Sequence, residues 1–270
     1  MKYIVDHDYH IHSKISSCSN DPEQTTERIL QYAEENNLKQ VCITDHFWDE
    51  NVPGASNWYK PQDFTHISQA KPLPQSDNVN FLFGCETELD KFLNLGVSQE
   101  RIKDFDFVII PTTHFHMTGF TVSEEQCETL ENRAKAWVTR FNAVLDMPLP
   151  FKKIGIAHLT CGLIARSSRM DYLKTLELIP SEEMERLFKK AAAVGVGIEL
   201  NSGDMKCSDE ETDIVLRPYK IAKQCGCKFY CGSDAHHPAV LDAAKAIFER
   251  AVNLLDLKES DKFIIDKHID

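Results

Sequence analysis

Two short motifs near the ends of the sequence carry side chains that could bind metal ions. His10 and His12 lie two residues apart in YHIHS, and Asp234 and His236 lie two apart in SDAHH. Side chains in a β-strand repeat with a period of two, so the imidazoles of the first pair would point the same way. Imidazole and carboxylate groups together suit Zn²⁺, Mn²⁺ or Fe²⁺. Four further candidate ligands lie between the two motifs: His46, Glu86, His114 and His158.

The number of candidates bears on how many ions they could hold. A single histidine is more often a surface or core residue than a ligand, and one His-x-His motif is weak evidence. The joint pattern of a histidine pair, an aspartate–histidine pair and single ligands between them favours a metal site. These ligands exceed what one tetrahedral ion uses, which predicts at least two ions, with Glu86 able to bridge them.

Each candidate ligand follows a short apolar run that is typical of a strand buried on both faces. Amphipathic, helix-like stretches over residues 25–37, 123–145 and 180–194 lie between such runs. Alternating strands and helices favour a parallel sheet, and seven of them without a break favour one closed (β/α) barrel. Such barrels place their active sites at the carboxyl ends of the strands, where all the candidate ligands fall. The predicted strands are residues 3–10, 40–44, 80–85, 105–110, 153–157, 195–200 and 228–231.

Six segments, taken in order, resemble the successive motifs of the PHP (polymerase and histidinol phosphatase) family. They are YHIHS, TDH, GCE, the histidine after DFVII, IAH and GSDAH, and the match runs from about residue 6 to residue 237. The resemblance implies a distorted (β/α)7 TIM-like barrel, expected to be a single domain over residues 1–270, with a trinuclear metal site.

The resemblance also implies which residues share each ion. One ion would take His10, His12, Glu86 and Asp234. A second would take Glu86, His114 and His158, and a third His46 and His236.

Cys18 departs from the family pattern. Phosphatases of the family usually have a further histidine for the third ion six residues after the second histidine of the His-x-His motif, and Cys18 stands there. A thiolate could bind at this position and would favour Zn²⁺ or another thiophilic ion. Equally, Cys18 could pack against the barrel and leave the third site weak. The expected cofactors are therefore two or three divalent ions (Zn, Mn or Fe).

The resemblance and the ligand set predict a metal-dependent phosphoesterase acting on a small phosphate monoester. A metal-bound hydroxide would attack phosphorus, and Glu86, Asp234 and His236 are the expected catalytic residues. Histidinol phosphate is the substrate that the family suggests. The loop LTCGLIARSS after His158 lacks the acidic residue expected of those enzymes, so other esters remain open.

Two further groups of residues have alternative interpretations. Arg166 and Arg169 follow the fifth strand and could bind phosphate, or belong to a solvated loop. Trp48, Trp58 and Tyr59 belong to a long loop, about residues 49–80, expected over the active-site face. Their aromatic rings could shape the pocket for the leaving group or only anchor the loop.

Two rival functions come from other classes. Amidohydrolases, which cleave C–N bonds, also begin with His-x-His on a barrel, but they typically bridge two metals with a modified lysine after the fourth strand. Here that strand ends in PTTHFH, without a lysine. The second rival is a non-catalytic metal-binding PHP module, which a degenerate site at Cys18 would suit.

Composition narrows the expected partners and location. The formal net charge of −12 argues against a nucleic-acid partner, because phosphate neutralisation needs a basic face. No apolar run approaches the ~20 residues that a membrane helix requires. Nine cysteines without a framework spacing predict a reducing, cytoplasmic location. Nothing in the sequence indicates an oligomeric state.

Overall fold

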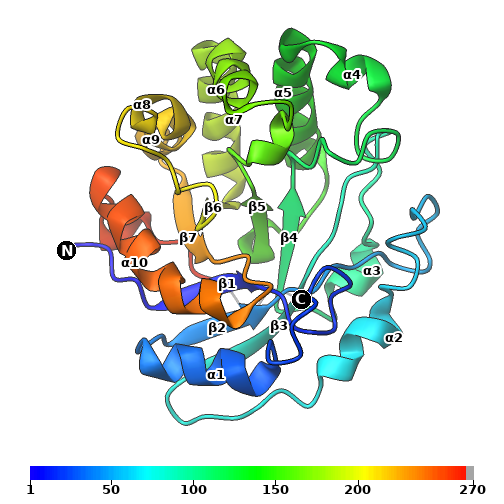
Figure 1. The fold of residues 1–270 in the computed structure, drawn as a ribbon, viewed down its shortest axis with the longest axis vertical. Coiled ribbons are helices and arrows are strands. Elements are labelled where there is room, and N and C mark those ends of the chain that lie inside the picture. Colours follow the sequence, from blue (N-terminus) through cyan, green and yellow to red (C-terminus); the bar gives the residue numbers. More distant parts are fainter. Residues whose placement is uncertain (266–270) are drawn as a thin grey trace.

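A computed structural model describes residues 1–265, and its centre is a sheet of seven parallel strands (Figure 1). Each strand pairs with the next one along the chain, in the order β1 to β7. The predicted seven-stranded (β/α) architecture is confirmed. The strands are β1 His7–Ile11, β2 Gln40–Ile43, β3 Asn80–Glu86, β4 Phe107–Pro111, β5 Ile154–Ala157, β6 Gly197–Asn201 and β7 Lys228–Gly232.

Hydrogen bonds just beyond the strand ends join β7 to β1. The backbone N–H of Asp234 donates to the carbonyl of His10 at 2.7 Å, and the N–H of His12 donates to the carbonyl of Ala235 at 3.0 Å. These bonds bring the two terminal motifs of the sequence side by side.

The helices lie around the outside of the strands (Figure 1). The α-helices are α1 Thr26–Glu35, α2 Phe64–Ile67, α3 Gln99–Ile102, α4 Glu124–Glu128, α5 Leu130–Asp146, α6 Arg169–Leu178, α7 Ser181–Val194, α8 Thr212–Val215, α9 Arg217–Gln224 and α10 Pro238–Leu254. Short 3-10 turns are η1 Ser68–Ala70, η2 Phe151–Lys153, η3 Gly162–Ile164 and η4 Glu259–Asp261.

Aromatic side chains fill the interior of the barrel below the strand ends. Tyr9 of β1 contacts Phe107 of β4, with ring centroids 5.6 Å apart, and Phe107 meets Tyr230 of β7 at 5.2 Å. Strands so far apart in the sheet order can meet only across the barrel. Phe263, after η4, joins this cluster from the C-terminal segment. The packed interior forms a rigid support beneath the polar residues at the strand ends.

Three element boundaries differ from the sequence predictions for local reasons. The helix predicted over 123–145 is divided at Thr129, whose extended backbone ends α4 and whose hydroxyl accepts the N–H of Asn132 to begin α5. The strand predicted from residue 195 begins later because Gly195 is in the left-handed conformation that ends α7. The first strand also begins later than predicted, since Tyr3 pairs through its N–H with the carbonyl of Leu257.

The long loop between β2 and β3 has the predicted character, with only α2 and η1 as regular structure. All nine cysteines lie within residues 1–265, and none forms a disulfide there. Across the same residues, the helices are too short or too polar to cross a membrane.

Candidate metal centre and its cavity

The predicted ligands gather at the carboxyl ends of the strands. Most are almost fully buried, although they are polar. Two of them, His158 directly after β5 and Asp234 two residues after the end of β7, have left-handed backbones with φ of 57° and 54°. Residues other than glycine rarely take this conformation, and it concentrates at functional sites. The surrounding structure thus holds both residues in a strained backbone conformation that orients their side chains toward the centre.

His10 and His12 face Glu86 and Asp234 across a small space. The two histidine Nε2 atoms lie 3.1 Å apart. Each lies 3.2–3.5 Å from Glu86 Oε2 and from Asp234 Oδ1. Ligand atoms about 2.1 Å from a tetrahedral zinc ion lie about 3.4 Å from one another. The separations are therefore those of atoms arranged around a common cation.

Glu86 and Asp234 each use their second oxygen to face His158. His158 Nε2 lies 3.5 Å from both Glu86 Oε1 and Asp234 Oδ2. The two oxygens of Glu86 are buried and have no hydrogen-bond partner among residues 1–265. A buried carboxylate without partners is costly, so this geometry fits divalent ions on both sides of Glu86. Asp234 was expected at one ion only, and it faces both groups.

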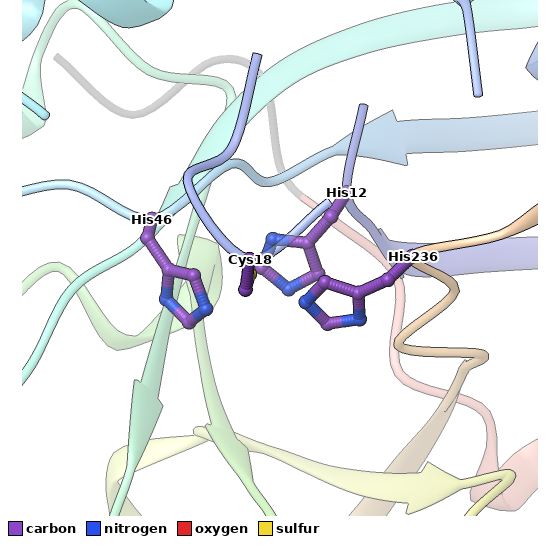
Figure 2. Close-up of side chains that lie close together, drawn as sticks. All are labelled: His12, Cys18, His46 and His236. Carbon is purple, nitrogen blue, oxygen red and sulfur yellow. The ribbon is translucent and has the colours of Figure 1, made fainter. Parts of the chain in front are cut away.

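A second cluster tests the prediction for Cys18. Single ligand atoms of His12, Cys18, His46 and His236 all lie within 4.8 Å of one another. Figure 2 shows these four side chains together, with the rings of His12 and His236 stacked at a centroid distance of 4.1 Å. The structure therefore brings Cys18 to the position where the third ion was expected.

His114 lies at the side of this centre, with its ring centroid 4.8 Å from that of His158. Its Nδ1 is 2.8 Å from the carboxylate of Glu88, which can only accept, so the proton is on Nδ1 and Nε2 keeps its lone pair. Glu88 in turn accepts from the buried guanidinium of Arg140 at 3.1 Å. Neither Glu88 nor Arg140 was predicted from the sequence.

Glu199 of β6 is a further residue that the sequence analysis missed. Its carboxylate is fully buried and accepts from His10 Nδ1 at 2.5 Å and from the backbone N–H of His158 at 2.9 Å. This bond fixes the proton of His10 on Nδ1 and leaves Nε2 free to bind a cation. The available signal was a lone acidic residue within an apolar strand, GIELN. Asp45, next to His46 in the sequence, accepts from the N–H and hydroxyl of Ser13 and not from a ligand histidine.

The histidines and carboxylates of the centre shift one another's pKa values. Burial alone would lower the pKa of His10 and His12, but nearby carboxylates raise the pKa of His12 to about 10 and that of His10 well above its usual value. Burial alone would raise the pKa of Glu86 and Asp234, but neighbouring histidines hold both well below the usual range. The two carboxylates therefore stabilise positive charge in the space that they share with the two histidines, as a cation site requires.

His46 and His236, two of the three imidazoles of the Cys18 cluster, are in the neutral state that binds metals. Burial lowers the pKa of His46 well below its usual value and that of His236 to about 4, so both rings are neutral at pH 7. His236 Nδ1 lies 2.9 Å from the carbonyl of Asp234, which places the proton on Nδ1 and the lone pair on Nε2. Burial raises the pKa of the Cys18 thiol, which would lose its proton on binding a cation.

A cavity of about 470 Å³ opens directly onto these ligands. The loop after β2 contributes Trp58 and Tyr59 to its wall, whereas Trp48 is buried and donates to the carbonyl of Val52. Trp58 and Tyr59 thus shape the cavity, and Trp48 anchors the loop.

The two arginines considered for phosphate do not line this cavity. Arg169 is instead paired with Glu211 through two hydrogen bonds of 2.6 and 2.7 Å. This partner is 42 residues away along the chain, which spacing does not reveal. Arg166 also lies outside the wall. Burial, together with the nearby charges of His114 and Arg166, lowers the pKa of His116, a wall residue, to about 4.

Comparison with known proteins agrees with this architecture. The solved histidinol phosphate phosphatase of Lactococcus lactis subsp. lactis Il1403, complexed with zinc, L-histidinol and phosphate, is 19% identical, with a TM-score of 0.59 over 92% of this chain and 94% of that one. A putative histidinol phosphatase of Listeria monocytogenes is 12% identical, with a TM-score of 0.63 over 90% and 99% of the two chains. A search of curated protein sequences finds no match. At these identities the neighbours establish the fold alone.

The family follows from the sequence itself. The model of the PHP domain matches residues 8–203, which is more than half of the chain and includes the predicted ligands from His10 to His158. The chain therefore belongs to the PHP family.

Proposed function

We propose that this protein is a metal-dependent phosphatase that hydrolyses small phosphate monoesters. The observation that carries the proposal is the buried carboxylate of Glu86, whose two oxygens lack hydrogen-bond partners within the described residues and face histidines on both sides. Membership of the PHP family and the cavity that opens onto this carboxylate support the same reaction class.

Two or three divalent ions would occupy the centre. One set of ligands is His10, His12, Glu86 and Asp234, a second is Glu86, Asp234, His114 and His158, and a third is Cys18, His46 and His236, with His12 close by. Bound there, the ions supply a water nucleophile that is activated at neutral pH and neutralise charge on the phosphate. The thiol of Cys18 favours zinc over manganese or iron in the third set.

Residues around the ligands fix the tautomers of the ligand histidines. The carboxylates of Glu199 and Glu88 hold the protons of His10 and His114 on Nδ1, so each ring offers a lone pair at Nε2. His236, with its Nδ1 committed to a carbonyl, can accept a proton only at Nε2. We assign proton transfer to Asp234 and His236 whenever their ligand atoms are not engaged by an ion.

The substrate class follows from the size of the cavity and from the relatives. A space of about 470 Å³ holds a small molecule. The solved Lactococcus lactis enzyme binds L-histidinol and phosphate, which makes histidinol phosphate one candidate substrate. Neither arginine considered above lines the cavity, so the bound ions must offset the charge of the phosphate.

The test is phosphate release from L-histidinol phosphate, nucleoside monophosphates, sugar phosphates and aryl phosphates. Metal-free protein and protein reconstituted with Zn²⁺ or with Mn²⁺ are compared. We expect turnover of at least one monoester only with metal, and its loss in Glu86→Gln but not in Glu128→Gln, a matched change on the exposed face of α4. Metal binding without release from any monoester would contradict the proposal, and hydrolysis of amides instead would favour a C–N hydrolase.

A further inference from the structure

The wall of the cavity beyond the predicted ligands is mostly aromatic and apolar, with Ser56, His116 and Thr118 as its polar side chains. Trp58 and Tyr59 come from the loop after β2, Phe120 from the loop after β4, and Leu163 from the loop after β5. Trp58 and Tyr59 meet edge to face at 4.8 Å, and Tyr59 packs on Phe120 at 5.6 Å. Two separate loops thus build one continuous aromatic surface beside the predicted metal ligands, and a third adds Leu163 to the cavity wall.

The same wall offers a charged leaving group no oppositely charged partner beyond the predicted ligands. In the part of the chain that the structure describes, no lysine or arginine lines the cavity. Its only carboxylates are Glu86 and Asp234, which face the histidines of the centre. An ammonium group or a second phosphate on the substrate would be desolvated here without a counterion, which is costly.

Tyr59 adds one polar group to this surface. Its side chain is fully buried, and its hydroxyl has no hydrogen-bond partner among residues 1–265 although the residue lines the cavity. A phenol hydroxyl is protonated at neutral pH and can donate a hydrogen bond. A buried donor without a partner has its bond available for a ligand.

We propose that the cavity selects phosphate monoesters whose alcohol part is uncharged and carries an aromatic ring, and that Tyr59 donates a hydrogen bond to an oxygen of that substrate. The inference rests on the proposed phosphatase activity and specifies its substrate class. Burial of a ring against Trp58, Phe120 and Leu163 supplies the affinity, and the absence of a counterion disfavours charged alcohols. L-Histidinol carries an amine that is protonated at neutral pH, so of the candidate substrates this inference ranks histidinol phosphate below uncharged aromatic esters.

The first experiment uses two matched pairs of substrates with metal-reconstituted protein. Phenethyl phosphate and glycerol phosphate have alcohols of similar basicity but differ in the ring. Phenylpropyl phosphate and L-phenylalaninol phosphate differ only in an amine that is protonated at neutral pH. We expect the uncharged aromatic ester to have the higher kcat/KM in each pair, by about tenfold or more. Equal or reversed preferences, with turnover present, would overturn this inference and leave the phosphatase intact, whereas no turnover of any ester would overturn the phosphatase.

Substitutions then locate the selectivity. Trp58→Ala should reduce the ratio of kcat/KM between phenethyl and glycerol phosphate, whereas Phe92→Ala, which removes an exposed ring outside the cavity, should not. Leu163→Asp should shift preference toward L-phenylalaninol phosphate, and the uncharged Leu163→Asn should not. An unchanged ratio in Trp58→Ala together with an unchanged preference in Leu163→Asp would contradict the assignment of this wall.

Tyr59→Phe separates binding from structure. Because the hydroxyl has no partner in the described protein, its removal should not lower the melting temperature. Loss of a hydrogen bond to the substrate should lower kcat/KM by about three- to tenfold. Unchanged kcat/KM for the aromatic esters would show that Tyr59 donates no such bond.

Discussion

Replacement of Glu199 by glutamine tests how the fold prepares His10 to bind a cation. The buried carboxylate accepts from His10 Nδ1 at 2.5 Å, from the N–H of His158 at 2.9 Å and from Asn201 Nδ2 at 3.2 Å. Glutamine preserves the volume but has only one accepting oxygen. If its NH₂ faces His10, the imidazole must accept at Nδ1, which moves the proton to Nε2. If the oxygen faces His10, the NH₂ opposes the N–H of His158.

Either outcome removes an interaction that positions a predicted ligand. Loss of such a partner typically weakens metal affinity by about 10- to 100-fold, which corresponds to about 1.4–2.8 kcal/mol. The unsatisfied donor should also lower the free energy of unfolding of the metal-free protein by about 1–3 kcal/mol. Gly232→Ala should act in the same direction, because a Cβ there would lie 2.1 Å from Glu199 Oε1 and displace the carboxylate.

The assay is competition for Zn²⁺ with a chromogenic chelator at pH 7.5, beside denaturant unfolding of the metal-free proteins. Glu183→Gln, on an exposed face of α7, is the matched control. We expect weaker zinc binding in Glu199→Gln and partial recovery of phosphatase activity at high metal concentration. Zinc affinity within twofold of the unsubstituted protein would refute the assignment of Glu199 as the residue that positions His10.

Three further predictions address other parts of the molecule. Cys18→Ser should weaken binding of zinc to the third ligand set by at least about tenfold and weaken manganese binding less, since a thiolate is a softer ligand than a hydroxyl. Zinc titrations that do not change would show that Cys18 only packs against the barrel. Arg140→Met should lower the free energy of unfolding by about 3–5 kcal/mol, because Glu88 would be left buried without its cation; a loss below 1 kcal/mol in urea unfolding would contradict this. Burial would raise the pKa of Asp6, but its bonds to His7 and Lys262 outweigh burial and lower it to about 2. Its stabilisation is therefore present above the unfolded pKa of about 3.9 and is lost as pH falls through 2. After allowance for solvent screening, Asp6→Asn should cost about 1 kcal/mol at pH 7, and a deficit that persists undiminished at pH 2.5 would oppose this explanation.

The positions of the predicted ligands could be anticipated because strand ends leave a local mark. The apolar runs before His46, Glu86 and His158 end at those residues, and parallel strands must bring their carboxyl ends together. Ligands at strand ends can be located without knowledge of contacts between distant segments, which is why the fold and the centre could be predicted together.

Residues whose role depends on a distant partner show no such signal in the sequence. Glu199 looked like an isolated acidic residue in a strand, and Arg140 looked like one charge on an amphipathic helix. Their roles depend on His10 and Glu88, which are 189 and 52 residues away along the chain. Arg169 is a third such case, because the sequence could not reveal that Glu211 engages it. Tertiary pairing decided all three cases.

The central claim is that Glu86 joins two divalent ions whose presence permits phosphate ester hydrolysis. The most direct test measures metal content by elemental analysis and phosphate release on the same samples of the unsubstituted protein and of Glu86→Ala. The account predicts at least two ions per chain in the first protein, and loss of the bridged pair together with turnover in the second. Full phosphatase activity in Glu86→Ala with unchanged metal content would contradict it.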